Sequence, residues 1–304
     1  ANAKPGGKVL IQPPIYMPML NAHGGVNQQM IHAPLTLEAD DKRLHYGIDF
    51  DAFEATIDAD THTFLMCNPH NPIGRVWTRD ELTRMAEICE KHDVMICSDE
   101  IHCDLVFEGH PHIPIAALSP EISQRTITLM APSKTFNIPS LGFSFAVIQN
   151  AALRERFQMA EAGVVPHVGV LGLTAALGAY TGGAAWLAQT MTYLQSNRDL
   201  LVDFVDEHLP QVKINCPEGT YLAWLDLRAY HTEGDKVGRG EGLVDSIPDE
   251  FFGFLSQGIE PYTLRHAKVA LNNGAAFGPG GEGFARLNFA TPRATLESAL
   301  KRMQ

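Results

Sequence analysis

The stretch TITLMAPSK (residues 126–134) joins an apolar, β-rich run to a lysine. Two earlier stretches have the same form, because TFLMCNPHNP (63–72) carries Asn71 after an apolar run and VMICSDEIH (94–102) carries Asp99. Short apolar runs bounded by turn-forming residues predict buried strands. Helical segments separate these runs, so the sequence predicts an α/β layer with a mainly parallel sheet, in which ligands bind beyond the carboxyl ends of the strands.

Further elements extend this pattern on both sides. VLIQ (9–12) and FAVIQN (145–150) predict two more strands. Between the strands, TRDE (78–81) has the form of a capping box, in which Thr78 and Glu81 satisfy each other's backbone donors. Apolar residues then recur at helical spacing, which predicts a helix with one face in the core.

The second part of the chain has a different texture. The stretch 183–208 predicts one long helix that ends before a proline. Strands and helices follow, including helices expected over 249–258 and about 293–303. We therefore expect a large domain over residues 1–182, a connecting helix over 183–208 and a small C-terminal α+β domain over 209–304.

The composition disfavours several classes of function. The 304 residues are 45% hydrophobic and 19% charged, which is typical of a globular chain with a substantial core. A net charge of −12 argues against nucleic-acid and anionic-membrane partners, which bind basic surfaces. Five cysteines without CxxC spacing indicate neither a disulfide framework nor a structural zinc site, and they fit a reducing cytoplasm. No apolar run is long enough to span a bilayer, and the first residues lack the architecture of a signal peptide.

Each polar residue at a predicted strand end also has an ordinary structural explanation. Asn71 precedes Pro72 and can shape a turn, and Asp99 can cap a following helix. His102 can be a satisfied, partly buried histidine, and Lys134 can extend from its strand to solvent. Parallel strands would nevertheless bring all four side chains to one crevice, which favours a shared site.

A lysine beside an aspartate in such a crevice suits pyridoxal 5′-phosphate (PLP). This cofactor needs a lysine amine for its Schiff base and a carboxylate that keeps the pyridine nitrogen protonated. Lys134 and Asp99 can supply these groups. Asn71 and His102 can donate hydrogen bonds near the phenolic oxygen, and Tyr16, after the first strand, can stack on the ring.

Five motifs, taken in order, resemble those of the fold-type I PLP-dependent enzymes of the class I/II aminotransferase superfamily. They are CNPHNPIGRVWT, SDEIHCDLVF, APSKTFNIPSLG, PEGTYLAWLDLR and GEGFARLNFATPR. The chain looks more closely like the branch of cystathionine β-lyases and cysteine-S-conjugate C–S lyases often called the MalY/PatB group. The resemblance covers essentially the whole sequence. It implies a fold-type I large domain, with a mainly parallel sheet between helices, and a smaller C-terminal α+β domain.

The resemblance also implies roles for individual residues. Lys134 would form the Schiff base, and Asp99 would pair with the pyridinium nitrogen. Asn71 and His102 would approach the phenolic oxygen, and Tyr16 would stack on the ring. These roles agree with those that the chemistry of the residues suggests.

Two further residues receive roles only through the resemblance. Ser133 would help to hold the phosphate. Arg286 would bind the α-carboxylate of a small amino-acid substrate with its two-pronged donor face. Without the resemblance, Arg286 is better explained as an edge-strand arginine paired with a surface acid.

The sequence departs from the family pattern around the phosphate. Ala131 stands where many aminotransferases have a phosphate-binding serine, and Gly142 stands where many transaminases have a phosphate-binding arginine. The family's N-terminal arm, first helix and phosphate-binding turn have no counterpart ahead of the first strand. We therefore expect these residues to begin inside a domain, with the N-terminal part of the family fold absent and the phosphate cup incomplete.

The resemblance implies a PLP-dependent α,β-elimination on cystathionine or a cysteine S-conjugate, which yields a thiol, pyruvate and ammonia. An aminotransferase that acts on an amino acid and a 2-oxo acid remains an alternative, because the two reactions share their site. A second alternative is an aminotransferase-like regulatory domain of a transcription factor. The family also implies a homodimer with shared active sites. For this chain we expect neither a nucleic-acid nor a membrane partner.

Two other patterns carry less information. GPGGEG (278–283) leads into a strand, whereas a dinucleotide-binding loop leads into a helix. His102, His110 and His112 lie close in sequence but lack a supporting cysteine pattern. We therefore expect no metal site.

Overall fold

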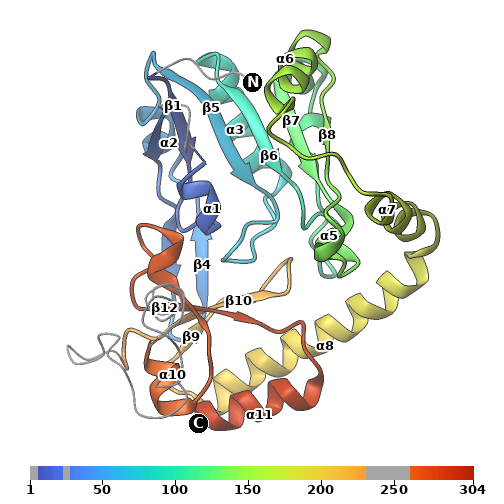
Figure 1. Cartoon of the computed structure of the whole chain (residues 1–304). Helices are drawn as coiled ribbons and strands as arrows, with labels where there is room; N and C mark the ends of the chain where they lie inside the picture. The colour runs from blue at the N-terminus through green and yellow to red at the C-terminus, as the bar shows by residue number, and fades with distance from the viewer. Residues whose placement is uncertain (1–5, 23–27, 231–260) are drawn as a thin grey trace.

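The computed structural model describes three segments of the chain, residues 6–22, 28–230 and 261–304. The helix expected over 249–258 lies outside these described residues. Figure 1 shows two sheets, one in the upper and one in the lower part of the view. The long helix α8 (Ala184–His208) runs down one side of the molecule toward the lower sheet.

The upper sheet has six strands, and every neighbouring pair is parallel except the last. In sheet order they are β2 (Gln29–His32), β1 (Lys8–Ile11), β5 (Thr61–Cys67), β6 (Met95–Asp99), β7 (Thr126–Met130) and β8 (Phe145–Val147). The expected, mainly parallel sheet is therefore confirmed. The pairing of Cys67 with Asp99, and of Asp99 with Leu129, brings the carboxyl ends of β5, β6 and β7 to one edge.

Short helices and a hairpin pack around this sheet. They are α1 (Met17–Leu20), α2 (Phe50–Ala55), α3 (Arg79–Lys91), η1 (Ile115–Ala117), α4 (Pro120–Gln124), α6 (Ala151–Glu161) and the hairpin of β3 (Thr36–Ala39) and β4 (Leu44–Gly47). Helix α3 begins after Thr78, and both bonds of the predicted capping box with Glu81 are present. Its inner face places Leu82 and Met85 in one core cluster with Trp77. The local sequence signals at 78–88 therefore predicted this helix correctly.

The segment that carries the lysine differs from its expected form. Strand β7 ends at Met130, and Lys134 lies in the short helix α5 (Pro132–Thr135) instead of on the strand. Pro132 has no backbone N–H and so cannot extend the ladder, whereas its fixed φ suits the first position of a helix. The lysine is therefore presented from a helical turn just beyond the carboxyl end of β7. A second short turn, η2 (Pro139–Leu141), follows.

Two helices lead away from the upper sheet. Helix α7 (Val170–Gly182) and helix α8 are bent by 80° with respect to each other. A methyl group at Gly183, between them, would lie 2.4 Å from an atom of the Phe136 ring, so only glycine fits this close approach. Helix α8 confirms the long helix expected over 183–208, and its Leu201 and Val205 are buried in the second core.

The lower sheet is antiparallel and has four strands. In order they are β11 (Asn272–Asn273), β12 (Phe284–Asn288), β10 (Leu222–Asp226) and β9 (Lys213–Ile214), accompanied by α10 (Pro261–Ala267), η3 (Gly274–Phe277) and α11 (Arg293–Met303). Leu225 and Leu287 of this sheet and Leu296 and Leu300 of α11 lie in the same core as the buried residues of α8. The expected last helix over 293–303 is confirmed.

The two sheets fall on either side of α8 in the sequence, within residues 1–182 and 209–304. The division into a large domain, a connecting helix and a small domain stays a prediction. Among the described residues, no single helix is long and apolar enough to cross a membrane. Helices α7 and α8 meet that test only when they are taken together.

Candidate active site

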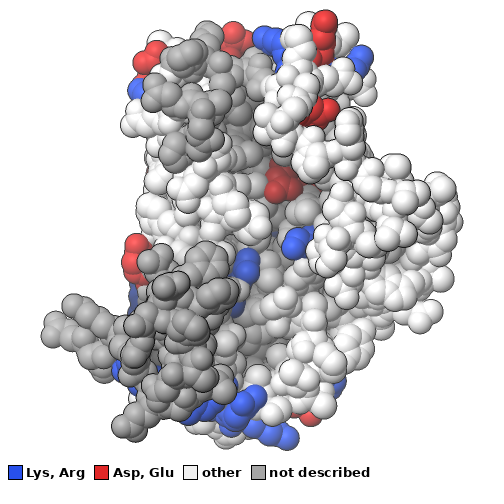
Figure 2. Space-filling model, in the orientation of Figure 1, with Lys and Arg blue, Asp and Glu red and all other residues white. Residues whose placement is uncertain are grey.

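A cavity of about 300 Å³ lies at the carboxyl ends of β5 and β6. Its lining contains six of the seven residues singled out from the sequence, namely Tyr16, Asn71, Asp99, His102, Lys134 and Arg286. Ser133 precedes Lys134 in α5 and is absent from this lining, so its role in holding a phosphate stays a prediction. In Figure 2 the surface is hollowed between the upper and lower parts of the molecule, and acidic and basic side chains lie inside the hollow.

The lining residues come from both sheets. Asp99 is the last residue of β6, and Lys134 lies on α5 after β7. Tyr16 directly precedes α1, which follows β1. Arg286 comes from β12 of the lower sheet and reaches Asn71 in the loop after β5. The site therefore exists only when the two sheets are packed together.

Asp99 is a partly buried carboxylate that lines the cavity. Burial raises the pKa of Asp99 to about 6, and the neighbouring Glu100 carboxylate adds to this rise. The backbone N–H of Ile101, which donates to Oδ1 at 3.1 Å, and the charge of Lys134 act in the opposite direction. A cationic partner such as a protonated pyridine nitrogen would favour the ionised form of this carboxylate.

His102 is a neutral hydrogen-bonding group in the cavity. Burial lowers the pKa of His102 to about 3, and the positive charges of Lys134 and Arg286 contribute to the decrease. Its Nδ1 is buried and has no hydrogen-bond partner within the described part of the chain. The ring lies edge-to-face with Tyr221, at 5.6 Å between centroids. A buried polar atom without a partner is unusual, and it fits a ligand that bonds to this nitrogen.

Arg286 is largely buried and is held by amide oxygens. Its Nη1 donates to Asn71 Oδ1 at 2.9 Å, and its Nη2 donates to Asn272 Oδ1 at 2.8 Å. The guanidinium lies over the ring of Phe277, 4.8 Å from the centroid. Burial lowers the pKa of Arg286, although a guanidinium keeps its charge at any ordinary pH. These contacts do not match the simple alternative of an edge-strand arginine paired with a surface acid.

Asn71 lies in a loop that is tied to the lower sheet. The carbonyl oxygen of Gly74 accepts hydrogen bonds from the backbone N–H groups of Glu218 and Gly219, at 2.9 and 3.0 Å. Gly74 adopts a φ of +65° and packs against the residues just before Glu218, so a side chain at position 74 would be strained. The segment that contains Glu218 and Gly219 continues to Tyr221, which lines the cavity. These bonds therefore position two cavity residues from opposite parts of the fold.

A larger hollow of about 1040 Å³ adjoins the cavity, because Asp99 and Ile101 line both. Ala131 and Gly142 also line this hollow. These are the two positions at which the sequence lacks the phosphate-binding side chains of the family. The space beside Asp99 is therefore open on the side of these small residues.

The donors and acceptors of the cavity fit PLP. Lys134 offers an amine to an aldehyde, and Asp99 offers a carboxylate to a pyridine nitrogen. Two buried nitrogen atoms, His102 Nδ1 and Arg286 Nε, have no hydrogen-bond partner among the residues described and can bond to a ligand. Tyr16 adds an aromatic face to the lining.

Sequence reasoning missed two residues of the site. Tyr221 lines the cavity, and burial raises its pKa. Its motif, PEGTYLAWLDLR, carries part of the family resemblance, but nothing local in the motif indicates which of its side chains reaches the site. Asn272 belongs to no recognised motif, and its contact with Arg286 follows from the pairing of β11 with β12.

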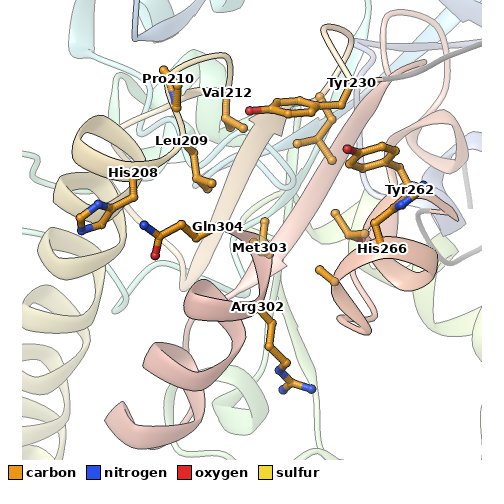
Figure 3. A pocket seen from close by; sticks show the side chains of 13 residues that line it. His208, Leu209, Pro210, Val212, Tyr230, Tyr262, His266, Arg302, Met303 and Gln304 are labelled. Atoms are coloured by element: carbon orange, nitrogen blue, oxygen red, sulfur yellow. The ribbon is translucent and has the colours of Figure 1, made fainter.

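A separate cavity of about 310 Å³ lies beside the lower sheet (Figure 3). His208, Tyr230, Tyr262 and Arg302 are among its lining residues. None of the residues predicted from the sequence lines it. This cavity therefore takes no part in the site described above.

Comparisons with known proteins agree with the fold and the site. Residues 1–303 match the family described as "Aminotransferase class I and II". "Cystathionine beta-lyase PatB" of Bacillus subtilis (strain 168) is 36% identical over 306 residues, which cover 100% of this chain and 72% of that protein.

Two of the similar solved structures each cover 99% of the chain. A PLP-bound putative aminotransferase from Clostridium difficile 630 has a TM-score of 0.85 and 37% sequence identity, with 71% of that chain covered. Cystalysin from Treponema denticola, which contains PLP, has a TM-score of 0.84 and 33% identity, with 70% of that chain covered. These likenesses confirm the expected fold-type I architecture. A match that runs from the first residue to the last but one shows that this chain belongs to the aminotransferase class I and II family.

Proposed function

We propose that this protein is a PLP-dependent C–S lyase that acts on a cysteine thioether such as cystathionine. One observation carries the proposal: Lys134, Asp99 and Arg286 line one cavity, although they come from three separate elements. The lyase is favoured because a relative that is 36% identical is named a cystathionine beta-lyase. That relative is named as an enzyme, which also disfavours the regulatory alternative.

Four of the lining residues have a task in this reaction. When bound, PLP supplies an electron sink for the negative charge that develops at the substrate Cα. Arg286 binds the α-carboxylate and thereby fixes the orientation of the Cα–H bond. Lys134 Nζ removes the proton from Cα and can return it to a later atom. With PLP bound, Asp99 would hold a proton on the pyridine nitrogen, and His102, being neutral, would donate or accept a hydrogen bond without adding charge.

The elimination breaks two bonds of the substrate. The Cα–H bond gives its proton to Lys134, and the Cβ–S bond gives its electron pair to the leaving thiolate. Water then hydrolyses the remaining three-carbon fragment to pyruvate and ammonia. The products are therefore a thiol, pyruvate and ammonia. The task of the protein is to hold the Cα–H bond and the Cβ–S bond in the geometry that permits both steps.

Replacement of Lys134 by alanine tests the assignment. We expect the variant to lose the visible absorption band that PLP develops with the wild type and to release no pyruvate from cystathionine. Lys301→Ala, at an exposed position on α11, is the matched control and should keep both properties. Pyruvate release at the wild-type rate by Lys134→Ala would refute the role of Lys134.

An aminotransferase is the second candidate. It is supported by the structure with 37% identity, which is described as a putative aminotransferase. Incubation with S-methylcysteine separates the two reactions. Release of thiol and pyruvate without an added 2-oxo acid supports the lyase, whereas a strict requirement for a 2-oxo acid supports the transaminase.

We also propose that the protein forms a homodimer through α7 and the residues that precede it, 162–169. Apolar side chains are exposed there, among them Val164, Val165, Val170, Leu171 and Leu177. An exposed cluster of this kind is typical of a surface that another chain covers. Leu171→Glu combined with Leu177→Glu should convert a dimer into a monomer in sedimentation velocity, and a wild-type monomer would refute the proposal.

A cytoplasmic location completes the proposal. It is supported by the five cysteines, all of which are free thiols in the structure. Labelling of fractionated cells with an antibody against the protein would test it, and recovery outside the cytoplasmic fraction would contradict it.

A further inference from the structure

Arg286 is bound by neutral side chains rather than by an acid. Its two described side-chain hydrogen bonds go to the amide oxygens of Asn71 and Asn272, at 2.9 and 2.8 Å. Within the described part of the chain, none of the ion pairs includes Arg286. A largely buried guanidinium without an anionic partner keeps its attraction for an incoming anion undiminished.

The register of the lower sheet places Asn272 opposite Arg286. In the antiparallel pair of β11 and β12, Asn272 faces Arg286 and Asn273 faces Ala285. Residues directly opposite each other in such a pair share one face of the sheet and have Cβ atoms about 5 Å apart. The ring of Phe277 contacts the guanidinium as well. The contact between Asn272 and Arg286 is therefore set by backbone pairing.

The contacts with Asn71 and Asn272 leave most of the guanidinium donors for a ligand. A guanidinium carries five N–H donors, and these two amide oxygens use two of them, so three remain. One of the three is on Nε, which is buried and lacks a partner among the described residues. A carboxylate can accept two parallel hydrogen bonds from such a face.

We propose that Asn272 is a positioning residue that orients Arg286 without neutralising it, and that the neutrality of position 272 makes the enzyme select substrates with an α-carboxylate. The inference rests on the proposed function, in which Arg286 binds that carboxylate. An aspartate at position 272 has nearly the shape of asparagine but carries a negative charge. It would form an ion pair with Arg286 and compete with the substrate.

The central experiment compares Asn272→Asp with Asn273→Asp. Asn273 is the matched control, because its Oδ1 caps η3 by accepting from Ala275 N at 3.0 Å, and aspartate makes the same cap. For S-methylcysteine, we expect Asn272→Asp to raise KM by about tenfold to a hundredfold with little change in kcat. Asn273→Asp should leave KM unchanged within about twofold.

Substrate selectivity is a measurement that would stay unchanged if Asn272 had only a structural role. We compare kcat/KM for S-methylcysteine with kcat/KM for its methyl ester, which has no carboxylate charge. Asn272→Asp should lower this acid-to-ester ratio by about the factor by which KM rises for the acid. Asn272→Ala, which removes the acceptor but adds no charge, should lower it less. Equal effects of the two variants would mean that orientation alone matters, and they would overturn the role of charge.

A binding measurement makes the test independent of turnover. Isothermal titration calorimetry of 3-(methylthio)propanoate, a thioether carboxylate without an amine, should show affinity about tenfold or more weaker for Asn272→Asp. The affinity for PLP should stay within about twofold of the wild type, which also verifies folding. If Asn272→Asp fails to fold, Asn272→Ala decides the question, and an unchanged KM and acid-to-ester ratio in that variant would overturn the proposal.

Arg286→Ala separates this inference from the proposed function. If Arg286→Ala weakens binding of the thioether carboxylate but Asn272→Asp does not, the inference about Asn272 is wrong and the role of Arg286 stands. If Arg286→Ala leaves the affinity and KM unchanged, the proposed role of Arg286 itself is wrong, and the inference about Asn272 is wrong with it.

Discussion

Replacement of Arg75 by methionine should weaken the junction between the loop that carries Asn71 and the lower sheet. Arg75 is 7% exposed and lies at the meeting point of three segments. Its Nε donates to Glu218 at 3.0 Å, and its Nη2 donates to both carboxylate oxygens of Glu81 at 2.9 and 3.0 Å. Its Nη1 donates to the backbone carbonyl oxygen of Tyr46. One side chain thus joins the hairpin, the start of α3 and the segment before β10.

The structure sets the size of the expected loss. Removal of one partner from a buried ion pair typically destabilises a protein by about 3–5 kcal/mol, because the other charge stays buried and unpaired. The side chains of Glu81 and Glu218 keep 20% and 18% of their exposure, so water screens part of this penalty. Methionine also retains much of the apolar volume of the arginine stem. We therefore expect Arg75→Met to lower the free energy of unfolding by about 3 kcal/mol.

Urea unfolding of the cofactor-free protein, followed by far-UV circular dichroism, measures this loss. Arg79→Met is the matched control, because Arg79 is exposed at the start of α3 and should change stability by less than about 0.5 kcal/mol. A double-mutant cycle with Glu218→Gln should give a coupling energy of about 1 kcal/mol or more. A loss below about 1 kcal/mol for Arg75→Met would refute the argument that the buried ion pairs hold the junction.

Three further predictions follow from the site and its surroundings. Burial raises the pKa of Asp99 from 3.8 to about 6. The protonated carboxyl therefore contributes fully to the stability of the folded state below about pH 4, and this contribution is lost as the pH rises through 6. The cofactor-free Asp99→Asn variant should therefore gain about 3 kcal/mol over the wild type as the pH rises from about 3 to 7, and a constant difference would contradict this. Burial lowers the pKa of His102 to about 3, so the ring proton resonances of His102 should not titrate between about pH 5 and 8. The His102→Gln variant assigns these resonances. A titration in this range would show that the ring is accessible to water. Gly183→Ala would place a methyl group 2.4 Å from the Phe136 ring and should lower the thermal midpoint of unfolding. In the control Gly178→Ala, the added methyl group meets nothing within 4 Å, so this variant should raise the midpoint slightly. Equal shifts in the two variants would contradict the close approach at Gly183.

Local features of the sequence determined most of the elements around the site. The capping residues Thr78 and Glu81 predicted the start of α3, and the apolar runs predicted β5, β6 and β7. Lys134 and Asp99 could be placed near each other because parallel strands align their carboxyl ends at one edge. These inferences succeed because capping, turn chemistry and side-chain period act over a few neighbouring residues.

Only the tertiary structure decided which side chains touch Arg286. Asn71 lies 215 residues away in sequence, and it meets Arg286 only when the upper and lower sheets pack together. Asn272 contacts Arg286 through the register of β11 and β12, and a shift by one residue would turn Asn272 to the opposite face. The antiparallel pairing of β8 with β7 was equally invisible in its short apolar run. Contacts of this kind depend on long-range register and packing, which no local pattern encodes.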